Sequence, residues 1–232
     1  MLYIVATPIG NLEDLTYRAV RLLGEVDVLA CEDTRQTRKI FDRYSIQRPK
    51  TILSYHEHNE RGAGKRILGF LEQGKTVALC TNAGLPGISD PGYRIISSAW
   101  EAGMEVRILP GATAVSTALL SSGLPSSSFT FKGFAPRKGG QRKRFLAAER
   151  DTGHTLVFFE SPYRVAAFLK DACETLGNRL AAVCIELTKK FEQTERGYLQ
   201  DLARDFEGRR IKGEVTVVIA GNNPKFIKEE SG

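Results

Sequence analysis

Short apolar runs alternate with amphipathic segments along the whole chain, and this alternation constrains the fold more than any other feature. In the first half, strands are predicted at Leu2–Ala6, Val26–Cys31, Thr51–Tyr55, Thr76–Cys80 and Glu105–Leu109. Helices are predicted between them at Leu15–Leu23, Asn59–Gln73, Tyr93–Ala102 and Ala112–Ser122. Within the first helix, Leu15, Ala19, Leu22 and Leu23 recur at helical spacing and predict one buried face. Such alternation is typical of the α/β class, with a mostly parallel sheet covered by helices.

A small, polar, turn-forming stretch at Ser121–Ser128 is the best candidate for a domain boundary. After it, strands are predicted at Phe129–Phe134, Thr155–Phe159, Ala181–Glu186 and Glu214–Ala220. Helices are predicted at Gln141–Arg150, Pro162–Leu176 and Tyr198–Phe206. We therefore expect two α/β domains, residues 1–122 and 123–232. The polar end, Asn222–Gly232, is expected to fray.

The composition narrows the class of protein. The 232 residues suffice for two modest domains, and no apolar run is long enough to span a bilayer. The start lacks the basic region of a signal peptide, so a cytoplasmic location is expected. Four cysteines without C-x-x-C spacing predict buried reduced thiols, and His56 and His58 lack an evident third ligand, so no metal is expected. The net charge of +6 permits a polyanionic partner without requiring one.

The loop Thr81–Gly92 follows a predicted buried strand and contains three glycines, two prolines and an aspartate. Such a loop lets backbone groups approach a ligand closely, and open α/β sheets place their sites at the carboxyl ends of strands. The sequence therefore predicts a binding site here. The usual nucleotide fingerprints are absent, because the first loop lacks G-x-G-x-x-G and Gly62–Lys65 is not a P-loop.

Charged clusters follow three other predicted strands. Glu32–Arg35 fits either a helix cap or a ligand-facing group, and its position in the sheet favours the second. Glu160–Arg164 combines charge with a Ser-Pro pair that suits a helix start, and Glu186–Glu192 is a charged cluster of the same kind. The basic segment Arg137–Arg144 is either a solvated loop and first helical turn or a phosphate-contacting patch.

Seven motifs occur in order: Tyr3–Leu12, Glu32–Arg35, Asn82–Gly92, Pro110-Gly111, Glu160–Arg164, Glu186–Lys189 and Lys212–Glu214. Together they cover nearly the whole chain and resemble the ribosomal RNA small subunit methyltransferase I family of the tetrapyrrole methylase superfamily. The resemblance implies two α/β domains with S-adenosylmethionine in the cleft between them. It also implies 2′-O-methylation of a cytidine in the decoding region of small-subunit rRNA, and a homodimer.

The residues expected to contact the cofactor follow from the same resemblance. The implied cofactor contacts are Pro8, Asn82, Ala83, Gly84, Leu85, Thr113, Ala114, Phe159, Leu187, Gly213 and Glu214. Cationic side chains are expected to contact RNA, and these are Arg35, Arg137, Lys138, Arg142, Lys143, Arg144 and Arg164. A ribose hydroxyl is a weak acid, so a base or a polarising cation is needed. The candidates, left unranked, are Asp33, Asp90, Glu160 and Lys189, and Lys189 would act as a base if burial lowered its pKa.

Two departures from the family pattern leave alternatives open. The central loop of the family reads Ser-Asp-Ala-Gly-Thr-Pro, whereas Asn82 here keeps the size and the hydrogen-bonding carbonyl but loses the charge. Many members carry a helical extension after the last strand, so ending at Gly232 would alter RNA affinity or target choice. The alternatives are a methyltransferase for a tetrapyrrole or other non-RNA acceptor, and a non-catalytic RNA-binding protein.

Overall fold

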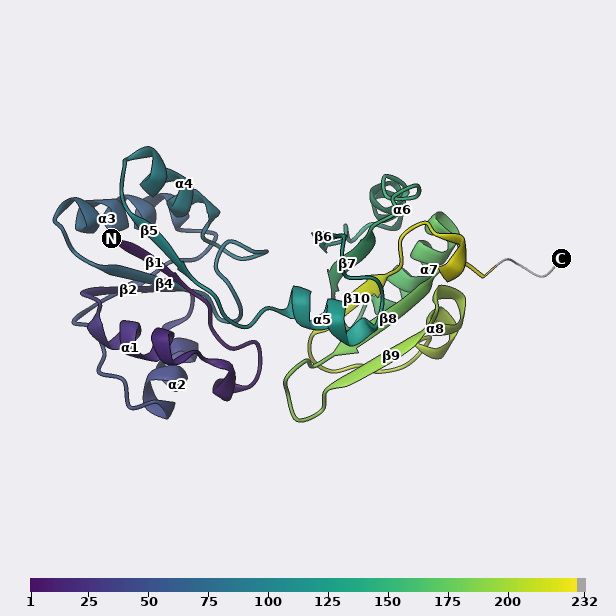
Figure 1. The fold of residues 1–232 in the computed structure, drawn as a ribbon, viewed down its shortest axis with the longest axis horizontal. Coiled ribbons are helices and arrows are strands. Elements are labelled where there is room, and N and C mark those ends of the chain that lie inside the picture. Colours follow the sequence, from purple (N-terminus) through teal and green to yellow (C-terminus); the bar gives the residue numbers. More distant parts are fainter. Residues whose placement is uncertain (229–232) are drawn as a thin grey trace. The chain divides into compact units, whose positions relative to one another are not determined.

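The computed structural model describes residues 1–228 and divides the chain into two compact units, Met1–Thr113 and Ala114–Gly232. Each unit has its own five-stranded sheet and its own apolar core (Figure 1), which confirms the two α/β domains. The second unit begins at Ala114, earlier than the expected start at Gly123. The reason is that helix α5 (Ala114–Ser122) packs on the second sheet, where it buries Val115, Ala118 and Leu119.

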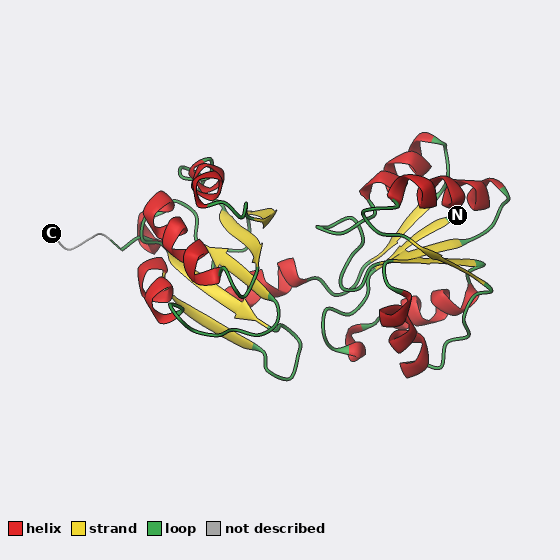
Figure 2. Ribbon diagram, turned by 180° about the vertical axis from the view of Figure 1, so that it is seen from behind, coloured by secondary structure: helices red, strands yellow, loops and turns green. Residues whose placement is uncertain are grey.

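The first sheet is entirely parallel, as the alternation predicted. Its order is β3-β2-β4-β1-β5, with β1 (Leu2–Val5), β2 (Val28–Cys31), β3 (Thr51–Ser54), β4 (Val77–Cys80) and β5 (Val106–Leu109). Helices α1 (Tyr17–Glu25) and α2 (Thr34–Arg43) cover one face, and α3 (Glu60–Glu72) and α4 (Tyr93–Glu101) cover the other (Figure 2). A short 3-10 helix, η1 (Leu12–Asp14), precedes α1.

Two details of the first unit differ from the sequence predictions. Helix α1 begins at Tyr17, because Thr16 caps it by accepting a hydrogen bond from the Ala19 amide, so Leu15 lies before the helix although it is buried. Helix α2 was not predicted. Its only large buried apolar side chains are Ile40 and Phe41, which is too sparse a pattern to mark a helix by periodicity.

The chain leaves neighbouring strands β1 and β4 in opposite directions. From β1 it runs to β2, whereas from β4 it crosses over β1 to reach β5 at the other edge. The carboxyl ends of β1 and β4 therefore form a topological switch point, which is where open α/β sheets bind ligands. The loop Thr81–Gly92 begins at this point.

The second sheet is mixed, so the expectation of a mostly parallel sheet is wrong for this half. Its order is β6-β7-β10-β8-β9, with β6 (Phe129–Phe134), β7 (Thr155–Glu160), β8 (Leu180–Ile185), β9 (Gln193–Tyr198) and β10 (Val215–Ile219). Within the described strands of this second sheet, only β6 and β7 pair in parallel. Helices α6 (Gly139–Ala147), α7 (Val165–Leu176) and α8 (Leu199–Asp205) cover the face opposite α5. Strand β9 was not predicted because it is a polar edge strand without apolar alternation.

The chain beyond β10 is tied to the second unit by a buried arginine. Arg179 is 1 % exposed, and its guanidinium donates to the carbonyls of Leu176 (2.9 Å) and Arg150. Ile227 forms a bridge with Arg179, after the 3-10 helix η2 (Pro224–Phe226). The expectation of fraying is thus wrong for residues 222–228, and residues 229–232 lie outside the described part. In the described chain, no helix is long and apolar enough to cross a membrane.

Candidate functional site

The loops that follow β1 and β4 are joined to each other. The Thr7 amide donates to the Gly84 carbonyl (2.8 Å), and the Gly84 amide donates back to the Thr7 carbonyl (3.0 Å). The Thr7 hydroxyl is buried and donates to the carbonyl of Thr81 (3.0 Å). Gly84 has φ +75, a left-handed conformation in which a side chain would be strained. The start of the loop Thr81–Gly92 is therefore fixed against the end of the first strand.

Glu60, at the start of α3, fixes the far end of the same loop. Its Oε1 accepts from the Gly92 amide (3.1 Å) and from the Tyr55 hydroxyl (3.2 Å), and its Oε2 pairs with Arg94 (3.3 Å). Burial and the nearby Glu60 carboxylate raise the pKa of Tyr55, which keeps its hydroxyl protonated as a donor. Gly92 is required there, because a Cβ would come within 2.8 Å of the Gly87 nitrogen. This anchor was not predicted from the sequence, although Glu60 belongs to the polar stretch around His56 and His58.

The expected cofactor contacts of the first unit lie on or beside this fixed loop. Pro8 is buried next to Thr7, and Ala83, Leu85 and Thr113 are partly exposed. Asn82 has an exposed side chain, while its amide donates to Glu32 Oε2 (3.1 Å). An amide side chain offers both donors and an acceptor, and the surrounding loop offers backbone groups, a set that suits a nucleoside.

Asp33 is the N-cap of α2. Its carboxylate accepts from the Arg35 amide (2.8 Å) and pairs with the Arg35 guanidinium (2.8 Å). Hydrogen bonds from Arg35 hold the pKa of Asp33 at about 2. The carboxylate is thus a weak base. The structure shows the helix cap, whereas the sequence had favoured the ligand-facing alternative.

Asp90 lies partly exposed in the central loop, after Ser89 in a left-handed conformation.

In the second unit, Lys189 lies between two carboxylates. Its Nζ is 2.7 Å from Glu186 Oε1 and 2.9 Å from Glu214 Oε2. Partial burial alone would lower the pKa of Lys189, but the hydrogen bonds and charges of Glu186 and Glu214 outweigh it and raise that pKa. These two ion pairs do not favour Lys189 as a neutral base. We therefore assign the side chain as a held ammonium ion.

Two residues of this unit that are expected to contact the cofactor, Leu187 and Gly213, lie next to the Glu186 partner of Lys189. Leu187 is buried between Glu186 and Thr188, which both have left-handed backbone conformations. Gly213 has φ +93, and a Cβ on it would come within 2.0 Å of Glu186 Oε1. The close contact of Glu186 with Gly213 and Glu214 thus depends on a glycine at this position. This is a reason for the Lys-Gly-Glu motif that sequence alone did not supply.

Glu160 ends β7, and its side chain is 0 % exposed. Oε1 accepts from the Ser161 amide (2.6 Å) and pairs with Arg164 Nη2 (2.5 Å), whereas Oε2 is buried without a hydrogen-bond partner in the described chain. Burial raises the pKa of Glu160, and its hydrogen bond from Ser161 and the charge of Arg164 oppose the shift. Because the carboxylate does not reach the surface, we assign it to holding the turn into α7 and Arg164.

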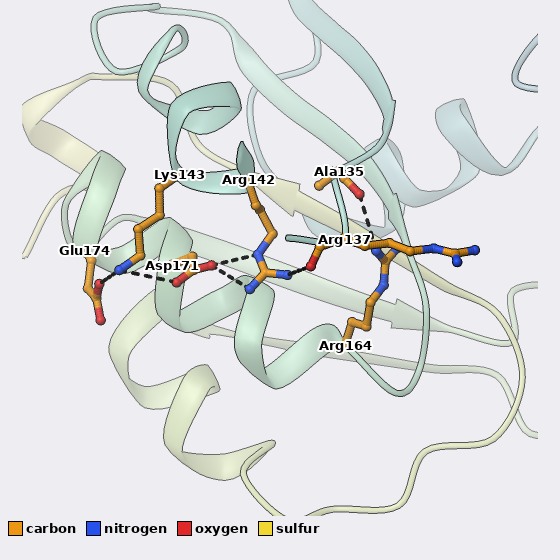
Figure 3. Close-up of polar contacts among 7 residues, drawn as sticks. All are labelled: Ala135, Arg137, Arg142, Lys143, Arg164, Asp171 and Glu174. Carbon is orange, nitrogen blue, oxygen red and sulfur yellow. Dashed lines mark hydrogen bonds and ion pairs between the residues drawn. The ribbon is translucent and has the colours of Figure 1, made fainter. Parts of the chain in front are cut away.

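Two cations of the basic segment, Arg142 and Lys143, are engaged within the second unit (Figure 3). Arg142 is 6 % exposed, and its guanidinium donates to Asp171 Oδ2 from Nε (2.7 Å) and to the Arg137 carbonyl from Nη1 (3.4 Å). Lys143 pairs with Glu174 and with Asp171 Oδ1 (3.6 Å). The predicted phosphate contact of Arg142 is therefore wrong, because its charge is buried and already paired with Asp171.

The other predicted RNA contacts are arranged differently. Arg164 donates to the Ala135 carbonyl (3.4 Å) as well as pairing with Glu160. Arg137, Lys138 and Arg144 are exposed and make no ion pair with another residue of the described chain. These three remain the available cations of the segment. Within residues 1–228, no three His, Cys, Asp or Glu side chains are grouped so as to hold a metal ion.

Comparison with known proteins first shows the broad class of protein to which the chain belongs. The family model that describes the tetrapyrrole (corrin/porphyrin) methylases matches residues 1–203. The fold is also that of solved structures of diphthine synthase (TM-score 0.69, 15 % identity, 94 % of this chain and 89 % of that one) and of the methyltransferase CobJ (TM-score 0.67, 18 % identity, 95 % and 94 %).

Relatives with higher sequence identity show which family within this class the chain belongs to. Ribosomal RNA small subunit methyltransferase I of Halalkalibacterium halodurans is 47 % identical over 99 % of this chain and 78 % of its own length. The protein of the same name from Thermotoga maritima is 43 % identical over 95 % and 98 %. The chain therefore belongs to the ribosomal RNA small subunit methyltransferase I family of the tetrapyrrole methylases, as the sequence motifs predicted.

Proposed function

We propose that this chain transfers a methyl group from S-adenosylmethionine to the ribose 2′-oxygen of a cytidine in the decoding region of small-subunit rRNA. The family membership over nearly the full chain supports this activity. The exposed cations of the basic segment favour RNA over a tetrapyrrole as the acceptor. We further propose that the enzyme acts in the cytoplasm as a homodimer.

The residues of the first unit fit the proposed cofactor. The loop between Thr81 and Gly92 is fixed at both ends, by Thr7 and by Glu60, so its backbone groups are already ordered before a ligand binds. Asn82 would hold a polar group of the cofactor through its exposed amide. When bound, S-adenosylmethionine supplies an electrophilic methyl group. The contacts expected from Ala114, Phe159, Leu187, Gly213 and Glu214 stay predictions.

The four candidate catalytic side chains now separate by role. We propose that Lys189 is a positive charge that stabilises the developing negative charge on the ribose oxygen, because its ammonium is held by two carboxylates and its pKa is raised. Asp33 and Glu160 are positioning residues, since one caps α2 and the other is fully buried. Asp90 lies partly exposed in the central loop and remains the candidate proton acceptor.

The test is transfer of labelled methyl from S-adenosylmethionine to small ribosomal subunits that lack the modification, followed by nucleoside analysis. Label in 2′-O-methylcytidine is the expected result. Cofactor binding measured by calorimetry on the same sample separates the alternatives. Binding without transfer to RNA would contradict the rRNA activity and favour another acceptor, whereas RNA binding without cofactor binding would favour the non-catalytic protein.

A further inference from the structure

Three phenylalanine rings gather where β6 and β7 end. The ring centroid of Phe159 lies 4.8 Å from that of Phe131, with the planes at 66°, and 5.6 Å from that of Phe134, with the planes at 60°. Phe131 and Phe159 are partly buried, whereas Phe134 is 58 % exposed. Phe134 therefore shows much of its ring to solvent while Phe159 supports it from the protein side.

A bulge in β6 sets the direction of this ring. Phe131 is paired with Val157 and Phe134 with Phe159, so β6 carries an extra residue between these two pairs. Gly133 lies inside the bulge with φ +64, which only glycine adopts without strain. Bulges re-aim side chains and are frequent beside functional sites, so the exposure of Phe134 is built into the backbone.

The loop that follows is held by two arginines, one from the basic segment and one from the start of α7. Arg164 donates to the Ala135 carbonyl (3.4 Å), and Arg142 donates to the Arg137 carbonyl (3.4 Å). Arg142 is itself fixed by its ion pair with Asp171 (2.5 Å). Figure 3 shows the Arg137 side chain extending away from this network. Within residues 1–228 this guanidinium makes no ion pair, so Arg137 presents a cation on ordered backbone three residues after Phe134.

The surroundings of Phe134 indicate which occupant suits it. An apolar protein surface would require apolar neighbours, but Arg137 and Lys138 are the exposed side chains that follow in the chain. An exposed aromatic ring followed closely in the chain by exposed cations matches single-stranded nucleic acid, whose bases stack on rings while its phosphates bind arginine and lysine. Methylation of a ribose in a structured RNA also requires the nucleotide to be accessible, which unstacks its base.

We propose that Phe134, supported by Phe131 and Phe159, is a stacking platform for an unpaired base of the RNA substrate, with Arg137 binding an adjacent phosphate. The inference rests on the proposed function for the identity of the polymer. It assigns the backbone contacts of Arg142 and Arg164 to holding the platform loop. It also adds a residue, Phe134, that the sequence motifs did not single out.

The test uses the full chain and a short single-stranded RNA that carries one 2-aminopurine, whose fluorescence is quenched by stacking. Phe134→Leu is expected to weaken binding about tenfold and to reduce the quenching, because base–aromatic stacking is lost. Phe134→Trp is expected to retain both. The matched control is Phe129→Leu, since Phe129 is 43 % exposed at the opposite end of the same strand and should bind within twofold of wild type.

Three results would contradict the stacking platform. The first is that the wild type does not bind the RNA, and the second is that Phe134→Leu binds and quenches as well as the wild type. The third is that the Leu and Trp variants lose binding equally while their unfolding midpoints stay unchanged. Methyl transfer by the wild type, assayed in parallel, separates this inference from the proposed function. Quenching without transfer contradicts the activity and keeps the platform, whereas transfer with no effect at Phe134 contradicts the platform alone.

Discussion

At the scale of single residues, the charged side chains divide into those that hold the protein and those that remain available to a substrate. Arg142 belongs to the first group, and its neighbour Arg144 to the second, although they stand two positions apart in one basic segment. The difference arises because α6 turns Arg142 toward Asp171 on α7. A charge run in sequence is therefore not one functional unit.

Arg142→Ala should destabilise the protein by about 3–5 kcal/mol, because it leaves the buried Asp171 carboxylate without its main partner. Arg144→Ala should change stability by no more than about 0.5 kcal/mol, since its side chain is exposed. Urea unfolding followed by circular dichroism measures both. Equal effects of the two substitutions would show that the ion pair does not support the fold.

Lys189→Met should lower the rate of methyl transfer by about 10²-fold or more, because a charge placed at the developing oxyanion is lost. Lys190→Met is the matched control, since Lys190 is exposed, and it should stay within twofold of wild type. The raised pKa of Lys189 also sets a sign. Its charge is fully present at neutral pH and is lost only as the pH rises above the ordinary lysine value, about 10.4.

A pH–rate profile of the wild type checks that sign. No decline attributable to Lys189 is expected between neutral pH and about 9. A change in the rate near neutral pH that disappears in Lys189→Met would contradict the held-ammonium assignment. It would instead favour Lys189 as the general base.

At the scale of elements, the turn after β5 is packed tightly against the end of β1. A Cβ added to Gly111 would lie 2.7 Å from the Cβ of Ala6, closer than real contacts allow. Gly111→Ala should therefore destabilise the first unit by about 1–3 kcal/mol through overpacking. Gly62→Ala is the control, because a Cβ on this α3 glycine meets nothing within 4 Å and should stabilise the helix by about 0.5–1 kcal/mol.

Thermal or urea unfolding decides the comparison. If the Gly111→Ala protein were as stable as the wild type, the end of β1 could shift to accept the extra methyl group without loss of unfolding free energy. Its cofactor affinity is a second measurement, because the first loop begins directly after Ala6 and carries Thr7, which fixes Gly84.

At the scale of the whole molecule, the net charge of +6 gives an expectation for RNA binding. Replacing Arg137, Lys138 and Arg144 together by Gln should reduce the slope of log affinity against log salt by about 2, since each lost phosphate contact to single-stranded RNA contributes about 0.7. Filter binding over a salt series measures the slope. A matched triple substitution of exposed cations elsewhere in the second unit, Lys170, Lys190 and Arg210, should leave it nearly unchanged.

An unchanged slope in the first triple variant would reduce the segment to a solubility feature. Arg142 and Lys143 are left out of that variant because both are paired with carboxylates, and their loss would confuse binding with folding.

The sequence by itself determined the class, the two-domain plan, the first sheet and the family. Strands and helices that bury apolar faces leave a periodic pattern of apolar residues in the sequence. Once the parallel strands are predicted, the loops that follow their carboxyl ends indicate the ligand-binding edge of the sheet. The order of motifs from Tyr3 to Glu214 then pointed to the family that the comparisons showed. Elements whose burial is slight, such as α2 and β9, were missed because they leave little periodic signal.

Only the tertiary structure decided which polar groups meet. Asp171 stands 29 residues from Arg142, and Gly92 stands 32 residues from Glu60, so no local pattern could pair them. The same holds for the antiparallel pairing of the second sheet and for the Phe159 ring beneath Phe134. Periodicity reports how each residue sits relative to the core, whereas hydrogen bonds, ion pairs and ring contacts depend on how distant segments are brought together by folding.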